Sequence, residues 1–233
     1  TIGFTCHSQK MSVSNNMLCQ YAYDGNLESL KDIICAQKEV ASVKDQDERQ
    51  PLHWACSAGH LSIVQYLLND CNVPIDQPDD SGWTPLIIAS SAGRDLIVKE
   101  LLRNSADPNK QTSTGCTALH YAASKNRYEI AQLLIASEAD VNIQDRNTYA
   151  SPLHRAASLG NIKIVNLLLD HKCKIDVQDS QGNTPLHLAC EEERADVAEL
   201  LHRHGASLVI QNKNEKTPTD LCPPYLKRRL LES

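Results

Sequence analysis

The stretch Thr184-Pro185-Leu186-His187-Leu188-Ala189 decides the fold, because close variants of it recur along the chain at a constant interval. Copies occur at residues 49–55, 84–89, 117–122 and 151–156, with a weaker copy around residue 18 and a degraded one at residues 217–219. The aligned positions are 18, 52, 86, 119, 153, 186 and 219, so the interval is 33 or 34 residues throughout. Repetition at such a period indicates a stack of small structural units.

The residue types in this pattern predict two helices in each unit. Thr184 can cap the first helix through its hydroxyl, and Pro185 suits the first turn, where no backbone N–H is missed. Leu186 and the small Ala189 are expected to face a core shared with the neighbouring units. A residue that tolerates a left-handed backbone follows seven positions after the leucine in five copies and should end the helix. These residues are Gly25, Gly59, Gly93, Asn126 and Gly160.

The second helix and a loop complete the unit. Residues 162–169 have the apolar spacing of a helix with one buried face. Segments such as residues 139–145 then lead through a hairpin-like loop into the next copy. The period and the Thr-Pro-Leu-His-x-Ala signature are those of ankyrin repeats.

We therefore predict an all-α ankyrin-repeat solenoid of seven stacked helix-turn-helix repeats joined by hairpin-like loops. It forms one domain over residues 13–233, and residues 1–12 are expected to be a disordered N-terminal extension. The repeats are expected near residues 15–48, 49–81, 82–114, 115–148, 149–181, 182–214 and 215–233.

Composition agrees with this prediction and argues against other classes. Aromatic residues make up only 4% of the 233 residues, which favours a thin core of aliphatic side chains. A net charge of -6 argues against nucleic-acid binding, and no apolar run is long enough to span a membrane. The nine cysteines include no Cys-x-x-Cys pair, which indicates small buried residues in a reducing compartment. We expect a monomer in the cytoplasm and nucleus.

The repeated histidines invite a metal-site or catalytic interpretation, but their spacing opposes it. His53, His120, His154 and His187 occupy the same position in different repeats, about 8–10 Å apart in stacked helices, too far to share one ion. We expect them to form hydrogen bonds between repeats. No phosphate-binding loop, His-Glu-x-x-His or Gly-x-Ser-x-Gly motif occurs, so we predict no catalytic residue, metal or cofactor and a non-enzymatic protein.

The positions that the signature leaves free are the candidates for binding. Two residues after each motif leucine stand large and varied side chains that should face the inner, concave side. They are Gln20, Trp54, Ile88, Tyr121, Arg155 and Leu188. Exposed Trp and Ile at such positions favour recognition of another protein. The alternative is that they pack against neighbouring loops.

Charge on the same side is unevenly distributed. The N-terminal loops carry acidic residues with Arg49 beside them, and cations follow further along. The acidic residues are Asp45, Asp47, Glu48, Asp79 and Asp80, and the cations are Arg94, Lys125, Arg127 and Arg155. Such a pattern would orient a partner with complementary blocks of charge. The alternative is a merely solvated charged surface.

A short motif offers a different binding hypothesis. Leu188, Cys190 and Glu192 match the Leu-x-Cys-x-Glu pattern that the pocket of retinoblastoma-type proteins binds in extended form. Here the first two lie in an expected helix with Cys190 facing the core, so exposure would require local unfolding. Repeat core plus an exposed Glu is the alternative.

Beyond the signature, the chain resembles the gankyrin family of ankyrin-repeat proteins. The resemblance rests on residues 47–60, 92–95, 119–127, 182–194 and 212–218. It includes Ser124-Lys125-Asn126-Arg127, which a general ankyrin consensus would not dictate, and covers roughly residues 13–230. The chain departs from the family pattern at Ile87, which replaces a motif histidine, at residues 1–12, and at Cys222-Pro223-Pro224-Tyr225.

The resemblance implies an assembly chaperone of the proteasome base that binds the C-terminal domain of an AAA+ ATPase subunit through the concave face. Carried over by position, it implies that Arg49 and Lys125 pair with acidic residues of that subunit. Asp47 and Asp80 would pair with basic ones, and the indoles of Trp54 and Trp83 would supply apolar contact. It also implies an alternative role as a cell-cycle adaptor that binds a cyclin-dependent kinase, a retinoblastoma-type protein or a p53 ubiquitin ligase.

Overall fold

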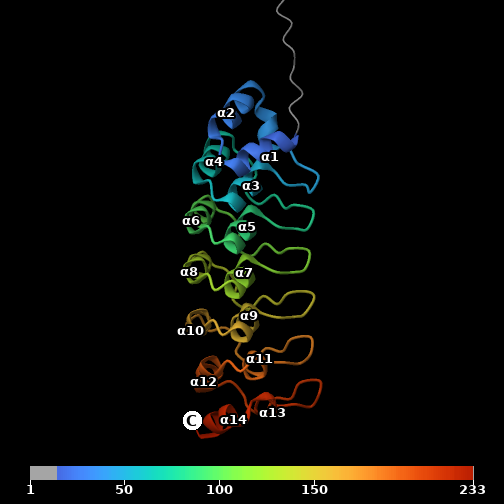
Figure 1. Cartoon of the computed structure of the whole chain (residues 1–233), viewed down its shortest axis with the longest axis vertical. Helices are drawn as coiled ribbons and strands as arrows, with labels where there is room; N and C mark the ends of the chain where they lie inside the picture. Colours follow the sequence, from blue (N-terminus) through green and yellow to red (C-terminus); the bar gives the residue numbers. More distant parts are fainter. Residues whose placement is uncertain (1–14, 233) are drawn as a thin grey trace, which may run out of the picture.

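The structure is a computed structural model that describes residues 15–232. The expected disordered extension, residues 1–12, lies outside the described residues. Within them the chain forms fourteen α-helices and no strand, arranged as seven helix pairs in one stack (Figure 1). The predicted solenoid of seven helical repeats is therefore confirmed.

Each repeat contributes one inner and one outer helix. The inner helices are α1 (Asn15–Asp24), α3 (Pro51–Ala58), α5 (Pro85–Ala92), α7 (Ala118–Ser124), α9 (Pro152–Leu159), α11 (Pro185–Glu191) and α13 (Pro218–Leu221). The outer helices are α2 (Leu27–Ala36), α4 (Leu61–Gln65), α6 (Asp95–Arg103), α8 (Tyr128–Ala136), α10 (Ile162–Asp170), α12 (Ala195–Arg203) and α14 (Pro224–Glu232). Two irregular helices add a 3₁₀ turn after α2 (Lys38–Ser42) and a π-helical turn that continues α4 (Tyr66–Asp70).

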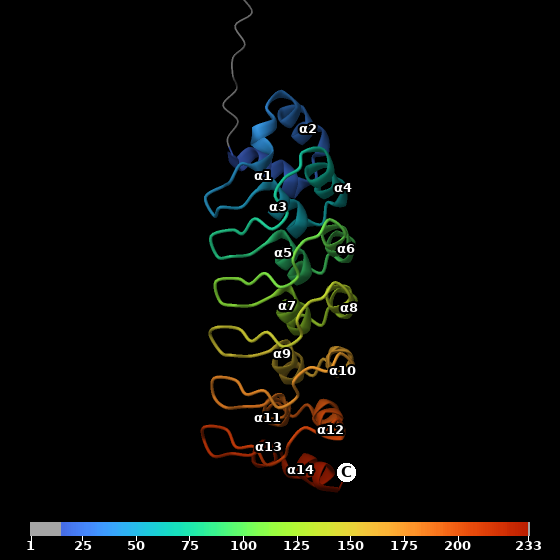
Figure 2. The same cartoon turned by 180° about the vertical axis from the view of Figure 1, so that it is seen from behind.

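The elements stand in three columns. The outer helices form one column along the long axis, the inner helices form the next, and the loops form the third, as the two opposite views show (Figures 1 and 2). Consecutive inner helices pack on each other, and each also packs on the outer helix of its own repeat. Because a repeat touches only its neighbours, stability depends on the contacts at each junction.

The helix ends form as the sequence predicts. The Thr184 hydroxyl accepts the N–H of His187 at 3.4 Å and caps α11. Gly59 follows α3 with φ of 103°, and Asn126 takes the equivalent left-handed position in the fourth repeat with φ of 54°. An added Cβ on Gly59 would lie 3.1 Å from the Arg94 side chain of the next repeat, so a glycine also suits the close approach there.

The loops are hairpins without strands. In the hairpin that enters the fourth repeat, the N–H of Thr112 donates to the carbonyl of Cys116 at 2.9 Å. The tip of that hairpin is joined to the preceding one by the N–H of Ser113, which donates to the carbonyl of Ser81 at 2.9 Å. The hairpin tips are therefore stacked by backbone hydrogen bonds in addition to the packing of the helices.

Three of the four repeated histidines link neighbouring repeats. In the fifth repeat, Nδ1 of His154 accepts the N–H of Ser151 at 3.1 Å, so the proton resides on Nε2. Nε2 donates to the carbonyl of Asn183 in the next hairpin at 3.0 Å. His120 and His187 make the same pair of bonds, so the expected hydrogen bonds between repeats are confirmed for these three. Nδ1 of His53 accepts from Gln50 in the same way, but its Nε2 donates to the carbonyl of Gln77, within the second repeat.

Burial keeps these imidazoles neutral. Burial is the largest effect on the pKa of each of the four, and it lowers all of them below the ordinary value of 6.5. The pKa of His120 falls to about 4. The neutral form is the one that can accept at Nδ1, so the pKa shift and the hydrogen-bond pattern agree.

The last repeat closes the stack. Leu226 and Leu230 of α14 are buried, while the guanidinium of Arg229 pairs with Glu199 of α12. None of the helices in the described part of the chain is long and apolar enough to cross a membrane.

Candidate protein-binding surface

We call the face made by the hairpins and the inner helices the inner surface. Of the six side chains predicted to line it, Gln20 is exposed, and Trp54, Tyr121, Arg155 and Leu188 are half-buried. Ile88 is only 8% exposed, so the expectation that it stands exposed is wrong. It lines a shallow hollow of about 220 Å³ together with Arg49, Ser57, Trp83, Ser91 and Ala92.

Trp54 is held by contacts with the first repeat and with Arg49 of its own repeat. Its indole N–H donates to a carboxylate oxygen of Asp45 at 2.7 Å, and the Arg49 guanidinium carbon lies 5.3 Å from the ring centre. Tyr23 of α1 approaches edge-on, with ring centres 5.8 Å apart and an interplanar angle of 84°. Packing against a neighbouring loop, the alternative considered above, therefore accounts for part of the Trp54 surface.

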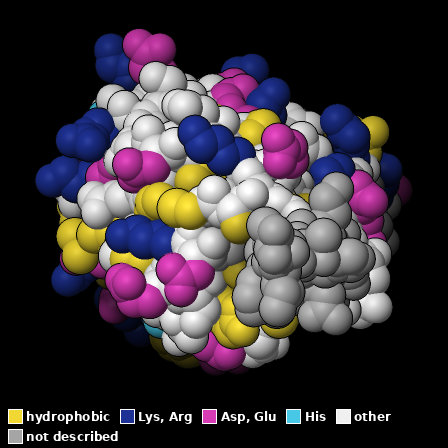
Figure 3. Space-filling model, turned by 90° about the horizontal axis from the view of Figure 1, so that it is seen from above, with side chains coloured by type: hydrophobic (Ala, Val, Ile, Leu, Met, Phe, Trp, Pro, Cys, Tyr) yellow, Lys and Arg dark blue, Asp and Glu magenta, His cyan; other side chains and the backbone are white. Residues whose placement is uncertain are grey.

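A hollow remains beside this tryptophan. It has a volume of about 330 Å³, and Tyr23, Asp47 and Trp54 are among its lining residues. Tyr23 is 48% exposed and is not among the residues predicted to bind a partner. Sequence reasoning missed it because it lies five residues after the motif leucine, one helical turn beyond the positions that were considered. Viewed from the N-terminal end, the surface shows charges of both signs around apolar patches (Figure 3).

A second aromatic pair joins the third and fourth repeats. The rings of Trp83 and Tyr121 lie 4.4 Å apart between centres, tilted by 38°. Trp83 comes from the hairpin and Tyr121 from α7, so the contact crosses the junction. Both are half-buried and retain surface that faces outward.

Some of the predicted charges are neutralised within the protein. Nε of Arg49 lies 2.9 Å from Asp79, whose side chain is fully buried and also accepts the N–H groups of Ser81 and Trp83. Asp45 similarly accepts the backbone N–H groups of Asp47 and Arg49. The expectation that Asp79 belongs to an acidic docking surface is wrong, because its side chain is buried and its oxygens accept hydrogen bonds within the hairpin. Asp45 is half-buried and uses its oxygens for hydrogen bonds to its own hairpin and to Trp54.

Arg155 is neutralised in the same way. Its guanidinium lies 2.6 Å from Asp145, whose side chain is only 1% exposed. Burial acts to raise the pKa of Asp145, but hydrogen bonds from Thr148 and Arg155 outweigh it, so the pKa is lowered. Arg49 and Arg155 remain partly exposed, at 31% and 38%, and can offer only the outer edge of each guanidinium to a partner.

Other predicted charges are open. Asp47 and Asp80 are exposed, and in the described part of the chain neither has a basic partner; Asp80 accepts only from the hydroxyl of Ser81. Lys125 is exposed with no carboxylate partner among the described residues. Arg94 is exposed too and uses Nε to donate to the carbonyl of Ser57 at 3.0 Å, which leaves its terminal nitrogens open. The open charges are acidic in the hairpins that enter the second and third repeats and basic at the inter-helix turns of the third and fourth.

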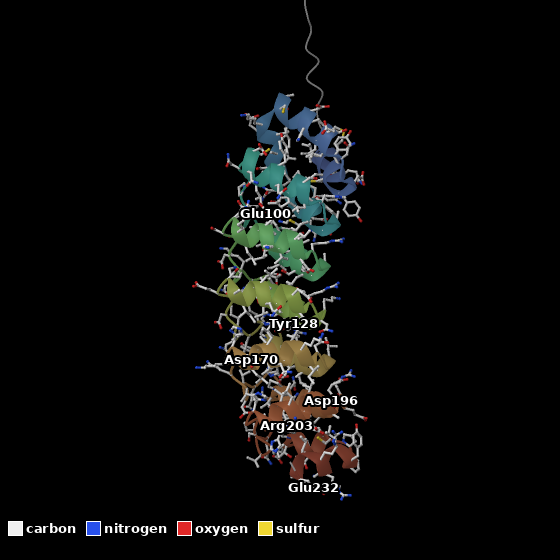
Figure 4. All side chains as sticks on the ribbon, turned by 90° about the vertical axis from the view of Figure 1, so that its left-hand side faces the viewer. Glu100, Tyr128, Asp170, Asp196, Arg203 and Glu232 are labelled. Carbon is white, nitrogen blue, oxygen red and sulfur yellow. The ribbon has the colours of Figure 1, made fainter. Side chains whose placement is uncertain are left out.

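The outer helices satisfy their charges differently. Glu100 is paired with Arg103 along α6, and Glu199 with Arg203 along α12. Glu100 and Arg203 lie on the outer-helix side of the stack (Figure 4). Such pairs within a single helix contribute little to stability and offer no block of one sign.

The short motif is folded into the core. Leu188 is half-buried and Cys190 fully buried in α11, while Glu192 is exposed just after the helix ends. An extended Leu-x-Cys-x-Glu segment therefore requires unfolding of α11. The described residues also contain no group of three or more His, Cys, Asp or Glu side chains that could hold a metal ion.

Comparisons with known proteins agree with this architecture. A family model described as "Ankyrin repeats (3 copies)" matches residues 18–112, 75–145 and 143–212. The human ASB11 ankyrin repeat domain superposes with a TM-score of 0.81 at 26% identity over 92% of this chain and 96% of that one. The ankyrin repeat domain of Bcl-3 gives a TM-score of 0.82 at 25% identity over 93% and 97%. The chain belongs to the ankyrin-repeat family.

Comparison with individual proteins of similar sequence narrows the family further. It is 39% identical to the "Probable 26S proteasome regulatory subunit p28" of Saccharomyces cerevisiae over 95% of this chain and the whole of that protein. It is 55% identical to human "26S proteasome non-ATPase regulatory subunit 10" over 31% of this chain and 32% of that protein. The chain is thus a gankyrin-like ankyrin-repeat protein, a non-catalytic protein-binding scaffold of the type found in the proteasome regulatory particle.

Proposed function

We propose that this protein is an assembly chaperone of the base of the proteasome regulatory particle, acting in the cytoplasm and nucleus. In this proposal its inner surface binds the C-terminal domain of one AAA+ ATPase subunit. The relatives named as proteasome regulatory subunits support a role at the proteasome. The observation that carries the binding mode is the division of open charge, with Asp47 and Asp80 towards one end and Lys125 beyond them.

This arrangement fits a partner with a basic region next to an acidic one. Open charges on a rigid stack are already positioned, so little ordering is needed when the partner binds. Their main effect is on orientation and on the rate of association. The aromatic side chains of Trp54, Trp83 and Tyr121 belong to the second, third and fourth repeats, which, with the hairpins that enter them, also present the open charges, and they supply partly exposed apolar area for the partner.

Arg49 has an internal partner in addition to the role that the resemblance implies. Its pairing with buried Asp79 means that Arg49→Glu would place two carboxylates together inside the hairpin. Loss of binding in such a variant would therefore report damage to the fold as well as to the surface. Asp47 and Lys125 have no such internal partner and give a cleaner test.

The test combines Asp47→Lys with Lys125→Glu, a double reversal that preserves the net charge. Binding to the isolated C-terminal domains of the ATPase subunits is measured by calorimetry. We expect the wild type to bind one of them and the double variant to bind it at least about tenfold more weakly, with an unchanged unfolding midpoint. The matched control is Glu129→Lys with Lys163→Glu on the outer helices, which is expected to bind normally.

The outcomes separate two kinds of error. If the wild type binds none of the ATPase domains, the chaperone proposal is wrong. If it binds one and the inner and outer double variants bind equally well, the partner is right and the surface is wrong. The cell-cycle alternative has weaker support, since its short motif is held inside α11.

A further inference from the structure

Two thiols meet where the sixth repeat joins the C-terminal cap. Cys190 lies in the last turn of α11, and Cys222 follows directly after α13. These two helices pack on one another, and the two cysteine side chains are hydrogen-bonded.

The two thiols differ in access and in acidity. Cys190 is fully buried, whereas Cys222 is half-buried and within reach of small solutes. The hydrogen bond with Cys222, reinforced by burial, raises the pKa of Cys190. The hydrogen bond from Cys190, helped by the nearby Lys227 ammonium, lowers the pKa of Cys222 although burial opposes this. An accessible sulfur that favours the thiolate thus stands beside a protected thiol.

We propose that Cys190 and Cys222 form a peroxide-sensitive thiol pair that oxidises to a disulfide between the sixth repeat and the C-terminal cap. A reactive, accessible cysteine next to a second thiol that can resolve it is the arrangement typical of redox-sensitive sites. The oxidant is hydrogen peroxide or another small hydroperoxide. Because the two side chains are already hydrogen-bonded in the reduced protein and α11 packs on α13, little rearrangement separates the two states.

The reaction balances in two steps. The Cys222 thiolate attacks one oxygen of the peroxide, the O–O bond breaks, and the leaving hydroxide takes up a proton to form water. Cys222 is then a sulfenic acid. The sulfur of Cys190 loses its proton and attacks the sulfur of Cys222, the S–O bond breaks, and a second water leaves. The two thiols have lost two electrons, and the peroxide has gained them.

The other cysteines lack this combination. Cys56 is fully buried, and its pKa is raised by burial. Cys173 is half-buried, but burial raises its pKa to about 11. Cys35 is exposed and Cys71 half-buried, both within hydrogen-bonding reach of the Tyr66 hydroxyl, so neither is a fully buried partner for the other. In the described part of the chain, Cys190 and Cys222 are the two cysteines whose side chains are hydrogen-bonded to each other, with one fully buried and the other accessible.

The disulfide would change the end of the stack. Pro223 and Pro224 follow Cys222 and lead into α14, whose Leu226 and Leu230 cover the core of the sixth repeat. A cross-link here ties the cap to α11 and restricts its local unfolding. It also holds Cys190 in the core, where the Leu-x-Cys-x-Glu segment stays helical.

The test uses the full chain, first reduced and then treated with a small excess of hydrogen peroxide. Remaining thiols are alkylated, and disulfides are located by peptide mass spectrometry. We expect a Cys190–Cys222 cross-link in the wild type, none in Cys222→Ser, and a normal cross-link in the matched control Cys173→Ser. Amide hydrogen exchange in α14 should slow after oxidation in the wild type and in Cys173→Ser, and should not slow in Cys222→Ser.

Two results would overturn the proposal. One is Cys222 recovered as a sulfinic acid, or unmodified, while Cys190 remains a free thiol. The other is a cross-link that maps to different cysteines and forms equally well in Cys222→Ser. Slower exchange in α14 of the oxidised Cys222→Ser variant would likewise show that the cap responds to something other than this disulfide.

Discussion

The junction between the third and fourth repeats and the junction between the fourth and fifth are held by different chemistry. Between the fourth and fifth repeats, His120 accepts from Thr117 and donates to the carbonyl of Ala150 at 3.1 Å. Between the third and fourth repeats, Ile87 occupies the histidine position; it is 1% exposed and has no polar side-chain atom. The tilted ring pair of Trp83 and Tyr121 crosses that junction instead. The same backbone stack can therefore be fastened by a polar bridge or by apolar and aromatic contact.

The histidine-bridged junction and the apolar junction at Ile87 should differ most in how their stability changes at low pH. A histidine with a lowered pKa contributes its full stability above about pH 6.5 and loses it as the pH falls towards the folded pKa. His120, with a pKa of about 4 in the folded state, alone should lose about 2 kcal/mol between pH 6.5 and pH 5. The other three histidines act in the same direction, so the total loss should exceed the effect of any single substitution below.

Urea unfolding at pH 7.5 and pH 5, followed by circular dichroism, measures this loss. Hydrogen exchange at the two pH values should show that the junction at Ile87 is the least affected. A free energy of unfolding that does not change over this range would mean that the imidazoles are not the bridging groups.

Removal of one bridge is the next largest change. His120→Ala leaves the Thr117 N–H without its acceptor and opens a cavity in a fully packed junction. We expect a loss of about 3 kcal/mol at pH 7.5, measured by urea unfolding. The variant should also show a weaker pH dependence than the wild type. Ile87→Ala serves as the control: it should lose a similar amount through its cavity and keep the full pH dependence.

The aromatic fastening can be measured by a double-mutant cycle. Tyr121→Ala and Trp83→Ala each remove partly buried ring surface, and the combined variant should be more stable than the sum of the two losses predicts. We expect a coupling of about 1 kcal/mol between the rings, obtained from the four unfolding free energies. A coupling of zero would show that the two rings stabilise the junction independently.

The fold could be predicted from the sequence because its determinants are local and repeated. Each repeat carries its own determinants, namely the motif leucine, the capping Thr or Ser and the glycine after the inner helix. Because every repeat has nearly the same shape, neighbouring repeats stack in the same way along the chain. Asn126 shows how far this extends, since it replaces a glycine and still takes the left-handed conformation with φ of 54°.

The inner surface was harder to predict because the role of each side chain depends on the hairpin geometry. Asp79 and Asp80 are adjacent in the sequence, yet the first is buried beneath Arg49 and the second is exposed. Residue type and spacing do not distinguish a carboxylate that turns inwards to accept backbone N–H groups from one that points to solvent. Ile88 differs from the prediction for a related reason: in the stack it packs into the shared core and is only 8% exposed, although its position is open on an isolated helix.

The smallest expected effect comes from converting one junction into the other. Ile87→His would supply an acceptor for the Thr84 N–H and a donor for the carbonyl of Cys116, which already accepts from Thr112 at 2.9 Å. The gain in hydrogen bonds is offset by the loss of a buried aliphatic side chain, so the unfolding free energy at pH 7.5 should change by less than about 1 kcal/mol. A fifth buried imidazole should nevertheless make the stability fall more steeply as the pH drops from 6.5. A variant that is equally stable at pH 7.5 but no more acid-sensitive would show that the imidazole does not enter the bridging position, and that Trp83 and Tyr121 have shaped this junction for an apolar residue alone.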